Sequence, residues 1–166
     1  MGEQANHQYI IATGSNQRHP RHGSPAAVLA AVPAALNACN VEVLAKAPII
    51  ASAPVGPSRR TYANGALLVE AALEPLLMLR CLQEIERVFG RVRRGQPWQA
   101  RTLDLDIVVW SGGISYGPEL TIPHPRFRER GFVLGPVAAI APSWRDPLSG
   151  LSMRQLLARL RKPRPA

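Results

Sequence analysis

The segment at residues 101–110, RTLDLDIVVW, constrains the possible fold more than any other part of the chain. Its apolar and β-branched residues predict a strand, and side chains alternate between the two faces of a strand. Asp104 and Asp106 therefore share one face, where two carboxylates repel each other and resist burial unless positive charge lies between them. The apolar residues at odd positions are expected on the opposite, buried face: Leu103, Leu105, Ile107 and Val109.

The patterns elsewhere in the chain predict the architecture around this strand. Further strands are expected at 8–16, 41–52 and 62–73, and helices at about 24–38 and 74–90. The order strand, helix, strand, strand, helix, strand predicts an α+β fold with a ferredoxin-like βαββαβ core, in which an antiparallel sheet carries both helices on one face. A C-terminal hairpin and helices near 129–141 and 151–161 complete the fold. The face that carries the two aspartates is expected to stay open toward the loops.

Length and composition favour one soluble domain. A chain of 166 residues and 18.0 kDa is expected to form a single domain over 1–166, with flexible tails at 1–7 and 162–166. The longest apolar run, 26–36, is too short to span a bilayer, and the polar N-terminus does not resemble a signal peptide, so a cytoplasmic protein without a membrane partner is expected. Cys39 and Cys81 lack metal-ligand spacing and are expected as reduced thiols.

The chain is strongly basic and its basic residues are nearly all arginine. Lys and Arg number 20 against 11 acidic residues, which gives a net charge of +9. Arginine suits phosphate oxygens, so nucleic acid or a nucleotide is a natural partner. A GC-rich genome that encodes positive charge as arginine would give the same composition. Only the positions of the arginines can distinguish these two explanations. Basic residues and one histidine flank the aspartates in sequence: Arg91, Arg93, Arg94, Arg101, His124, Arg126, Arg128 and Arg130. Paired carboxylates among arginines are typical of a Mg²⁺–polyphosphate site.

Each of these residues also has a purely structural interpretation. The aspartates could form a solvated strand face or salt bridges with nearby arginines. Tyr62 and Phe132 could be core aromatics. His124, between two prolines, could be a turn residue, and Glu86 could be a charge on a helix surface.

Several motifs together resemble the 6-hydroxymethyl-7,8-dihydropterin pyrophosphokinase family. They are RTLDLDIVVW at 101–110, ELTIPHPRFRERGFVLGPVAAIAP at 119–142, IATGSN at 11–16, YANG at 62–65 and EIERVFGRVRR at 84–94. The resemblance covers about residues 8–145 in the family's order. It implies an enzyme of folate biosynthesis that uses two Mg²⁺ ions and ATP. The hydroxymethyl oxygen of the pterin attacks the β-phosphorus of ATP, AMP leaves, and the pterin diphosphate forms.

The resemblance also implies a role for each matched residue. Asp104 and Asp106 would hold the metal. With them, the catalytic group would contain Arg91, Arg101 and His124. The nucleotide would contact Glu86, Arg93, Trp98, Ile107 and Arg130. The pterin would contact Ser52, Val55, Tyr62, Asn64 and Phe132, with the two aromatic rings on either side of it. The implied partners are ATP and the pterin alone, bound by a monomer that takes no nucleic acid.

The sequence departs from the family pattern in two loops. Gln99 and Ala100 replace Gly and Pro before the aspartates, and Ile50 and Ser52 stand at the family's Tyr and Thr positions.

Two other functions remain open at this point. A basic ferredoxin-like fold also describes an RNA-binding module, although few aromatics lie on the predicted strands and two acids would repel RNA phosphates. A homologue that binds pterin or nucleotide without catalysis is the second.

Overall fold

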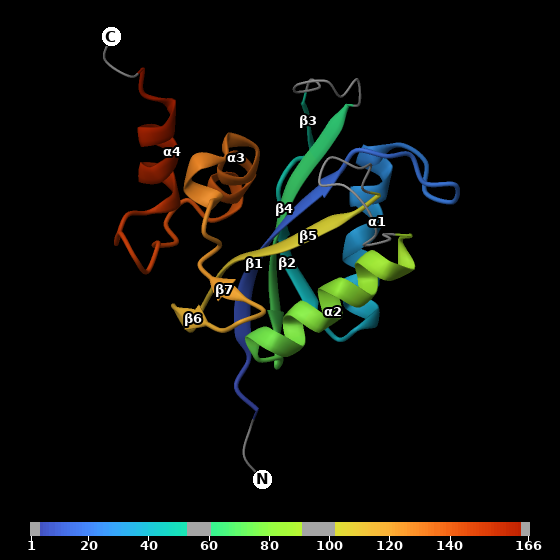
Figure 1. The fold of residues 1–166 in the computed structure, drawn as a ribbon, viewed down its shortest axis with the longest axis horizontal. Helices are drawn as coiled ribbons and strands as arrows, with labels where there is room; N and C mark the ends of the chain where they lie inside the picture. The colour runs from blue at the N-terminus through green and yellow to red at the C-terminus, as the bar shows by residue number, and fades with distance from the viewer. Residues whose placement is uncertain (1–3, 53–60, 91–101, 164–166) are drawn as a thin grey trace.

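The computed structural model describes residues 4–52, 61–90 and 102–163. In chain order its elements are β1 (His7–Ser15), α1 (Pro25–Ala38), β2 (Glu42–Lys46), β3 (Ile50–Ser52), β4 (Tyr62–Ala71), α2 (Pro75–Val88), β5 (Asp104–Trp110), β6 (Ser115–Tyr116), β7 (Thr121–Ile122), the 3-10 helix η1 (Phe127–Glu129), α3 (Gly131–Ile140) and α4 (Met153–Arg161). The α+β class with an antiparallel sheet is confirmed. The main sheet has the order β2-β4-β1-β5, and β3 also pairs with β4 (Figure 1).

Helix layers cover both faces of this sheet (Figure 1). The first core lies under α1 and α2 and includes Val32, Leu82 and Leu105. The second core lies under α3 and α4 and includes Leu134 and Val108. The packing of α1 and α2 on one face was predicted. The prediction that the opposite face stays open is wrong for the end of β5, where Val108 and Val109 are buried in the second core, while the aspartates lie in the earlier part of the strand.

A β-bulge at Val108 explains this division of β5. Along β1, Ile10 pairs with Val109 while Ile11 pairs with Ile107, so Val108 has no partner of its own in the register. The extra residue interrupts the alternation of side chains. Ile107 consequently lies in the first core but Val109 in the second, so the prediction that Val109 shares a face with Leu105 is wrong.

The predicted strand at 41–52 is two strands. β2 and β3 pair with different parts of β4, and Pro48 lies between them, where it can donate no ladder hydrogen bond. The helix expected at 129–141 begins only at Gly131, after η1. Residues 1–3 and 164–166 of the predicted tails lie outside the described residues, and β1 already begins at His7. Within the described part, no helix is long and apolar enough to cross a membrane.

Candidate active site

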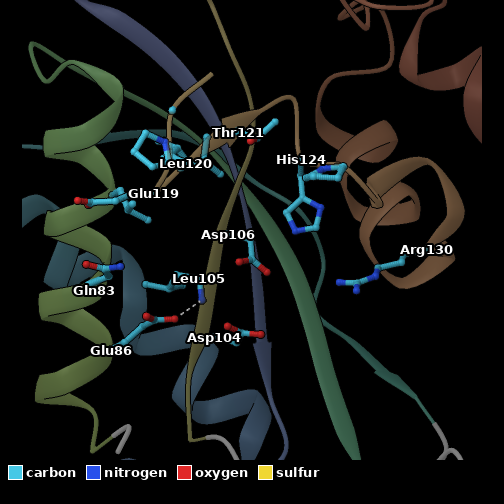
Figure 2. A pocket seen from close by; sticks show the side chains of 15 residues that line it. Gln83, Glu86, Asp104, Leu105, Asp106, Glu119, Leu120, Thr121, His124 and Arg130 are labelled. Carbon is cyan, nitrogen blue, oxygen red and sulfur yellow. Dashed lines mark hydrogen bonds between the residues drawn. The ribbon is translucent and has the colours of Figure 1, made fainter. Parts of the chain in front are cut away.

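A pocket of about 490 Å³ lies beside the exposed half of β5. α2 forms one wall, the β6–β7 hairpin and the residues after it form another, and β5 forms the floor (Figure 2). Its volume is within the range of small-molecule sites. Six residues predicted from the sequence line it: Glu86, Asp104, Asp106, Ile107, His124 and Arg130.

The two aspartates direct their carboxylates into this pocket, on the side of His124 and Arg130 (Figure 2). Both are partly exposed, and both take part in interactions with other groups. Among the described residues there is no group of three or more His, Cys, Asp or Glu side chains that could hold a metal ion. Two carboxylates alone suit Mg²⁺, which typically takes one or two protein carboxylates and completes its shell with water and substrate phosphates.

Glu86 connects α2 to the strand that carries the aspartates. Its side chain is 2% exposed, and its Oε2 accepts a hydrogen bond from the backbone N–H of Leu105 at 2.9 Å. The interpretation of Glu86 as a surface charge is therefore wrong. Leu79, Gln83 and Glu86 recur at helical spacing and all line the pocket, so one stripe of α2 forms its wall.

Backbone contacts fix the orientation of His124. Its N–H donates to the carbonyl of Val108 at 2.9 Å, and its ring Nδ1 accepts the N–H of Arg126 at 3.1 Å. Burial, followed by the positive charge of Arg130, lowers the pKa of His124 below its usual value. The ring is therefore neutral at neutral pH. Because Nδ1 is the acceptor, Nε2 carries the proton and is available as a donor.

The segment between His124 and Arg130 is anchored to the second core and to Asp146. Phe127 is fully buried in the second core. Arg128 stacks its guanidinium 4.5 Å from the centre of the Phe127 ring and donates to both oxygens of Asp146, at 2.7 Å each. This two-pronged ion pair joins the segment to the loop before α4.

Asp146 is the acceptor on which this anchor depends. It is 0% exposed, and it also accepts hydrogen bonds from the Ser149 hydroxyl at 2.6 Å and the Leu148 N–H at 3.1 Å. Burial acts to raise the pKa of Asp146, but the bonds from Arg128, Ser149 and Leu148 outweigh it and lower the pKa from 3.8 to about 2. The carboxylate is therefore ionised throughout the physiological range.

Asn64 lies across β1 from Asp104. Gly14 of β1 pairs with Asn64 on one side and Asp104 on the other. A Cβ at Gly14 would lie 3.4 Å from Asn64 Oδ1 and 4.0 Å from Asp104 Cβ, so all three positions face the same side of the sheet. The absence of a side chain at Gly14 leaves space between the predicted pterin and metal ligands.

The predicted aromatic pair lies outside the lining of this pocket. Tyr62 is partly buried at the start of β4, opposite Ser52 in the register, and Phe132 is 50% exposed at the start of α3. The alternative that Phe132 is a core aromatic is wrong. The remaining predicted residues lie outside the described residues: Val55, Arg91, Arg93, Trp98 and Arg101.

Several residues of the pocket were not predicted from the sequence. Gln83 comes from α2, and Glu119, Leu120 and Thr121 come from the hairpin (Figure 2). The helical spacing of Gln83 before Glu86 was the available signal. The hairpin residues carry no such signal in the sequence, because only the fold brings them to α2. There a Glu119 carboxylate oxygen lies 3.8 Å from a guanidinium nitrogen of Arg80.

Comparison with known proteins supports one family. The family model of 7,8-dihydro-6-hydroxymethylpterin-pyrophosphokinase (HPPK) matches residues 10–142. A 2-amino-4-hydroxy-6-hydroxymethyldihydropteridine pyrophosphokinase of Pseudomonas aeruginosa is 37% identical over 89% of this chain and 88% of its own. The Synechocystis enzyme of the same name is 43% identical over 61% of this chain and 52% of its own.

A solved structure is similar in fold. The crystal structure of Plasmodium falciparum HPPK-DHPS with pteroate has a TM-score of 0.72 and 12% identity, and covers 96% of this chain and 43% of that chain. The chain thus spans about half the length of the Synechocystis relative and less than half of the Plasmodium chain.

Proposed function

Because the chain belongs to the 7,8-dihydro-6-hydroxymethylpterin-pyrophosphokinase family, we propose that it transfers pyrophosphate from ATP to 6-hydroxymethyl-7,8-dihydropterin in folate biosynthesis. The hydroxymethyl oxygen attacks the β-phosphorus, the bond from this phosphorus to the α-phosphate oxygen breaks, and AMP leaves. The hydroxyl proton is released, and the pterin diphosphate is the second product. The observation that carries the proposal is the convergence of Asp104, Asp106, His124 and Arg130 on one pocket.

Asp104 and Asp106 hold the metal in this proposal. Two Mg²⁺ ions, when bound, would supply the positive charge that draws the triphosphate to the two carboxylates and offsets charge developing on its oxygens. The position of both carboxylates on the floor of the pocket supports this assignment. In the reaction the two side chains orient the triphosphate and take no proton.

His124 and Arg130 bind the phosphate oxygens that the metal does not reach. The neutral His124 ring donates from Nε2, since Nδ1 is already an acceptor. Arg130 supplies a permanent positive charge, and Figure 2 shows its guanidinium directed toward the aspartates. Arg91, Arg93 and Arg101 are proposed as further phosphate contacts and Trp98 as a contact to the nucleotide, on the family resemblance.

The two substrates occupy opposite sides of the aspartates. The nucleoside lies against Leu79, Gln83 and Ile107, which line the pocket. The pterin lies toward Asn64, whose amide offers both a donor and an acceptor to the edge of a polar heterocycle. Ser52, Val55, Tyr62 and Phe132 are proposed as further pterin contacts. Gly14 leaves room for the hydroxymethyl group to reach the phosphates.

The finer features of the protein are proposed with this function. The strand order supports a ferredoxin-like topology in one domain. A monomer in the cytoplasm, with small molecules as its only substrates, fits the family.

ATP binds first and assembles the pterin site, so a non-hydrolysable ATP analogue should tighten pterin binding, and pterin should tighten binding of the analogue by the same factor. Calorimetry of each ligand with and without the other measures both factors.

The activity is tested by incubating the protein with ATP, Mg²⁺ and the hydroxymethyl-dihydropterin and separating the nucleotides by chromatography. Stoichiometric AMP that appears only with the pterin supports the proposal. AMP formation without the pterin, or none under any condition, contradicts it. A filter-binding assay with single-stranded RNA addresses the RNA-binding alternative, which the carboxylates on the pocket floor disfavour.

A further inference from the structure

A second cavity lies between the loop after α3 and the start of α4, separate from the active-site pocket. It measures about 260 Å³ and shares no lining residue with the pocket between α2 and β5. α4 packs on the second core through Met153 and Leu156, on the sheet face opposite α1 and α2 (Figure 1). The residues that line this cavity are Pro142, Ser143, Arg145, Ser152, Arg154 and Gln155.

The lining of this cavity is cationic, because two of its residues are arginines and none is acidic. Asp146 follows Arg145 in the chain, but its carboxylate is buried and accepts two hydrogen bonds from Arg128. In the part of the chain that the structure describes, neither Arg145 nor Arg154 forms an ion pair. The positive charge of the cavity is therefore not neutralised by any described residue.

Backbone contacts hold the two sides of the cavity together. Arg145 and Ser152 form an antiparallel bridge, and the N–H of Arg154 donates to the carbonyl of Pro142 at 3.1 Å. The guanidinium of Arg145 donates from Nη1 to the carbonyl of Gly150 at 2.8 Å, which restrains one of the two cationic side chains. Because the walls are already ordered, a ligand would lose little of its binding energy to ordering them.

The donors that this cavity offers are side chains, because the first N–H groups of α4 are already used. The N–H of Gln155 donates to the Ser152 hydroxyl at 3.1 Å in a capping box, and the N–H of Arg154 bonds the loop. Arg154 is the second residue of α4, where the helix dipole disfavours a cation, and the first turn has no acidic residue. This position of Arg154 becomes favourable only when an anion lies beside it.

We propose that this cavity is a second binding site for a small, soluble phosphate compound, with Arg145 and Arg154 as its charged donors. A guanidinium presents N–H groups in a planar fork that matches two oxygens of one phosphate. The Ser143 hydroxyl supplies a further donor on the lining. A volume of about 260 Å³ holds a phosphate group with a small organic substituent and lies below the range of about 300–1,000 Å³ typical of drug-sized ligands.

Amide NMR of the native protein during a titration with inorganic phosphate, at constant ionic strength, tests this site because it reports where the anion binds. We expect saturable shifts in the amide signals of residues 143–146 and 151–155, whatever happens at the active-site pocket. Shifts in these signals that grow without saturation, or saturable shifts confined to active-site residues such as His124, would overturn the proposal. The result does not depend on whether the protein is an active enzyme.

Two double variants with the same loss of charge separate a specific site from general attraction. Arg145→Gln with Arg154→Gln should weaken phosphate binding at these amides by at least about tenfold, because hydrogen bonds from two charged groups are lost. Arg159→Gln with Arg161→Gln removes two charges from the last turn of α4, outside the cavity lining, and should bind phosphate as the wild type does. Equal weakening in both double variants would contradict the site. The wild-type titration stands as a test even if a variant fails to fold.

A lipid headgroup presents the same phosphate chemistry, so a sedimentation assay distinguishes the two sources. The protein is mixed with phosphatidylcholine vesicles that contain phosphatidic acid, and the vesicles are pelleted. Wild type should pellet no more than the Arg145→Gln, Arg154→Gln variant does, because the proposed ligand is soluble. Greater pelleting of the wild type would overturn the assignment to a soluble phosphate compound.

Discussion

Asp146→Asn should destabilise the protein although this residue lies outside the pocket. The substitution keeps the size of the side chain but removes its charge and one of its two acceptor oxygens. The carboxylate accepts from Arg128 twice, from Ser149 and from Leu148. The amide oxygen can serve only part of this set, and the new NH₂ group faces donors.

Two estimates of the loss in free energy of unfolding agree. The fall in the pKa of Asp146 from 3.8 to about 2 corresponds to about 2.5 kcal/mol in favour of the folded, ionised form, at about 1.4 kcal/mol per pKa unit. Losing one or two hydrogen bonds to a charged group costs about 1.5–3 kcal/mol each. We expect a loss of about 3 kcal/mol, which lowers Tm by roughly 6–12 °C for a domain of this size.

Urea unfolding at neutral pH measures this loss, and Ser149→Ala is the matched control. Ser149→Ala removes one part-buried hydrogen bond to the same carboxylate and should cost about 1 kcal/mol. The difference in free energy of unfolding between wild type and Asp146→Asn should disappear as the pH falls from about 4 to about 2. Over this range the Asp146 carboxylate of the wild type is protonated and loses the charge that the variant lacks. The KM for ATP should rise, since Arg128 anchors the segment that carries His124 and Arg130. A loss below about 1 kcal/mol would refute this account of the ion pair.

Three further predictions concern the pocket. Asp104→Asn and Asp106→Asn should each lower turnover by roughly 10³-fold or more with the fold intact, because each alters a proposed metal ligand; near-normal turnover in the AMP assay would contradict the metal assignment. An NMR titration should place the pKa of His124 below its usual value of 6.5. The unfolded chain then takes up the proton at higher pH than the folded protein does, so stability falls as the pH drops below 6.5. A titration midpoint at or above 6.5 argues against a neutral ring. Gly14→Ala should change the free energy of unfolding by less than about 1 kcal/mol, since its Cβ makes ordinary contacts, yet raise the KM for the pterin several-fold; an unchanged KM would show that this space is not used.

The sequence predicted those parts of the fold that depend on local pattern. Alternation in 103–107 placed Asp104 and Asp106 on one face correctly, because nothing interrupts the strand there. Val109 was misplaced, since a bulge is a property of the pairing with β1 and has no signature in β5 itself. Pro48 is the residue in 41–52 that marks the break between β2 and β3, because proline cannot donate a ladder hydrogen bond.

The candidate site was predictable where a charged motif or a family motif marks it. Asp104, Asp106 and His124 stand out in sequence, and the pocket contains all three. Asp146 does not stand out, because its importance comes from a partner, Arg128, that only the tertiary fold brings near.

The bulge at Val108 makes the length of β5 more restrictive than its composition. Having no partner in the β1 register, Val108 gives its carbonyl to the N–H of His124. Deleting Val108 would leave a regular ladder in which Val109 still pairs with Ile10 and Trp110 with Tyr9, but it would remove the carbonyl that accepts from the His124 N–H. Substituting Val108 by another apolar residue would keep this contact, because it is made by the backbone. Members of this family should therefore keep an apolar residue at this position and the residue count from Asp106 to His124.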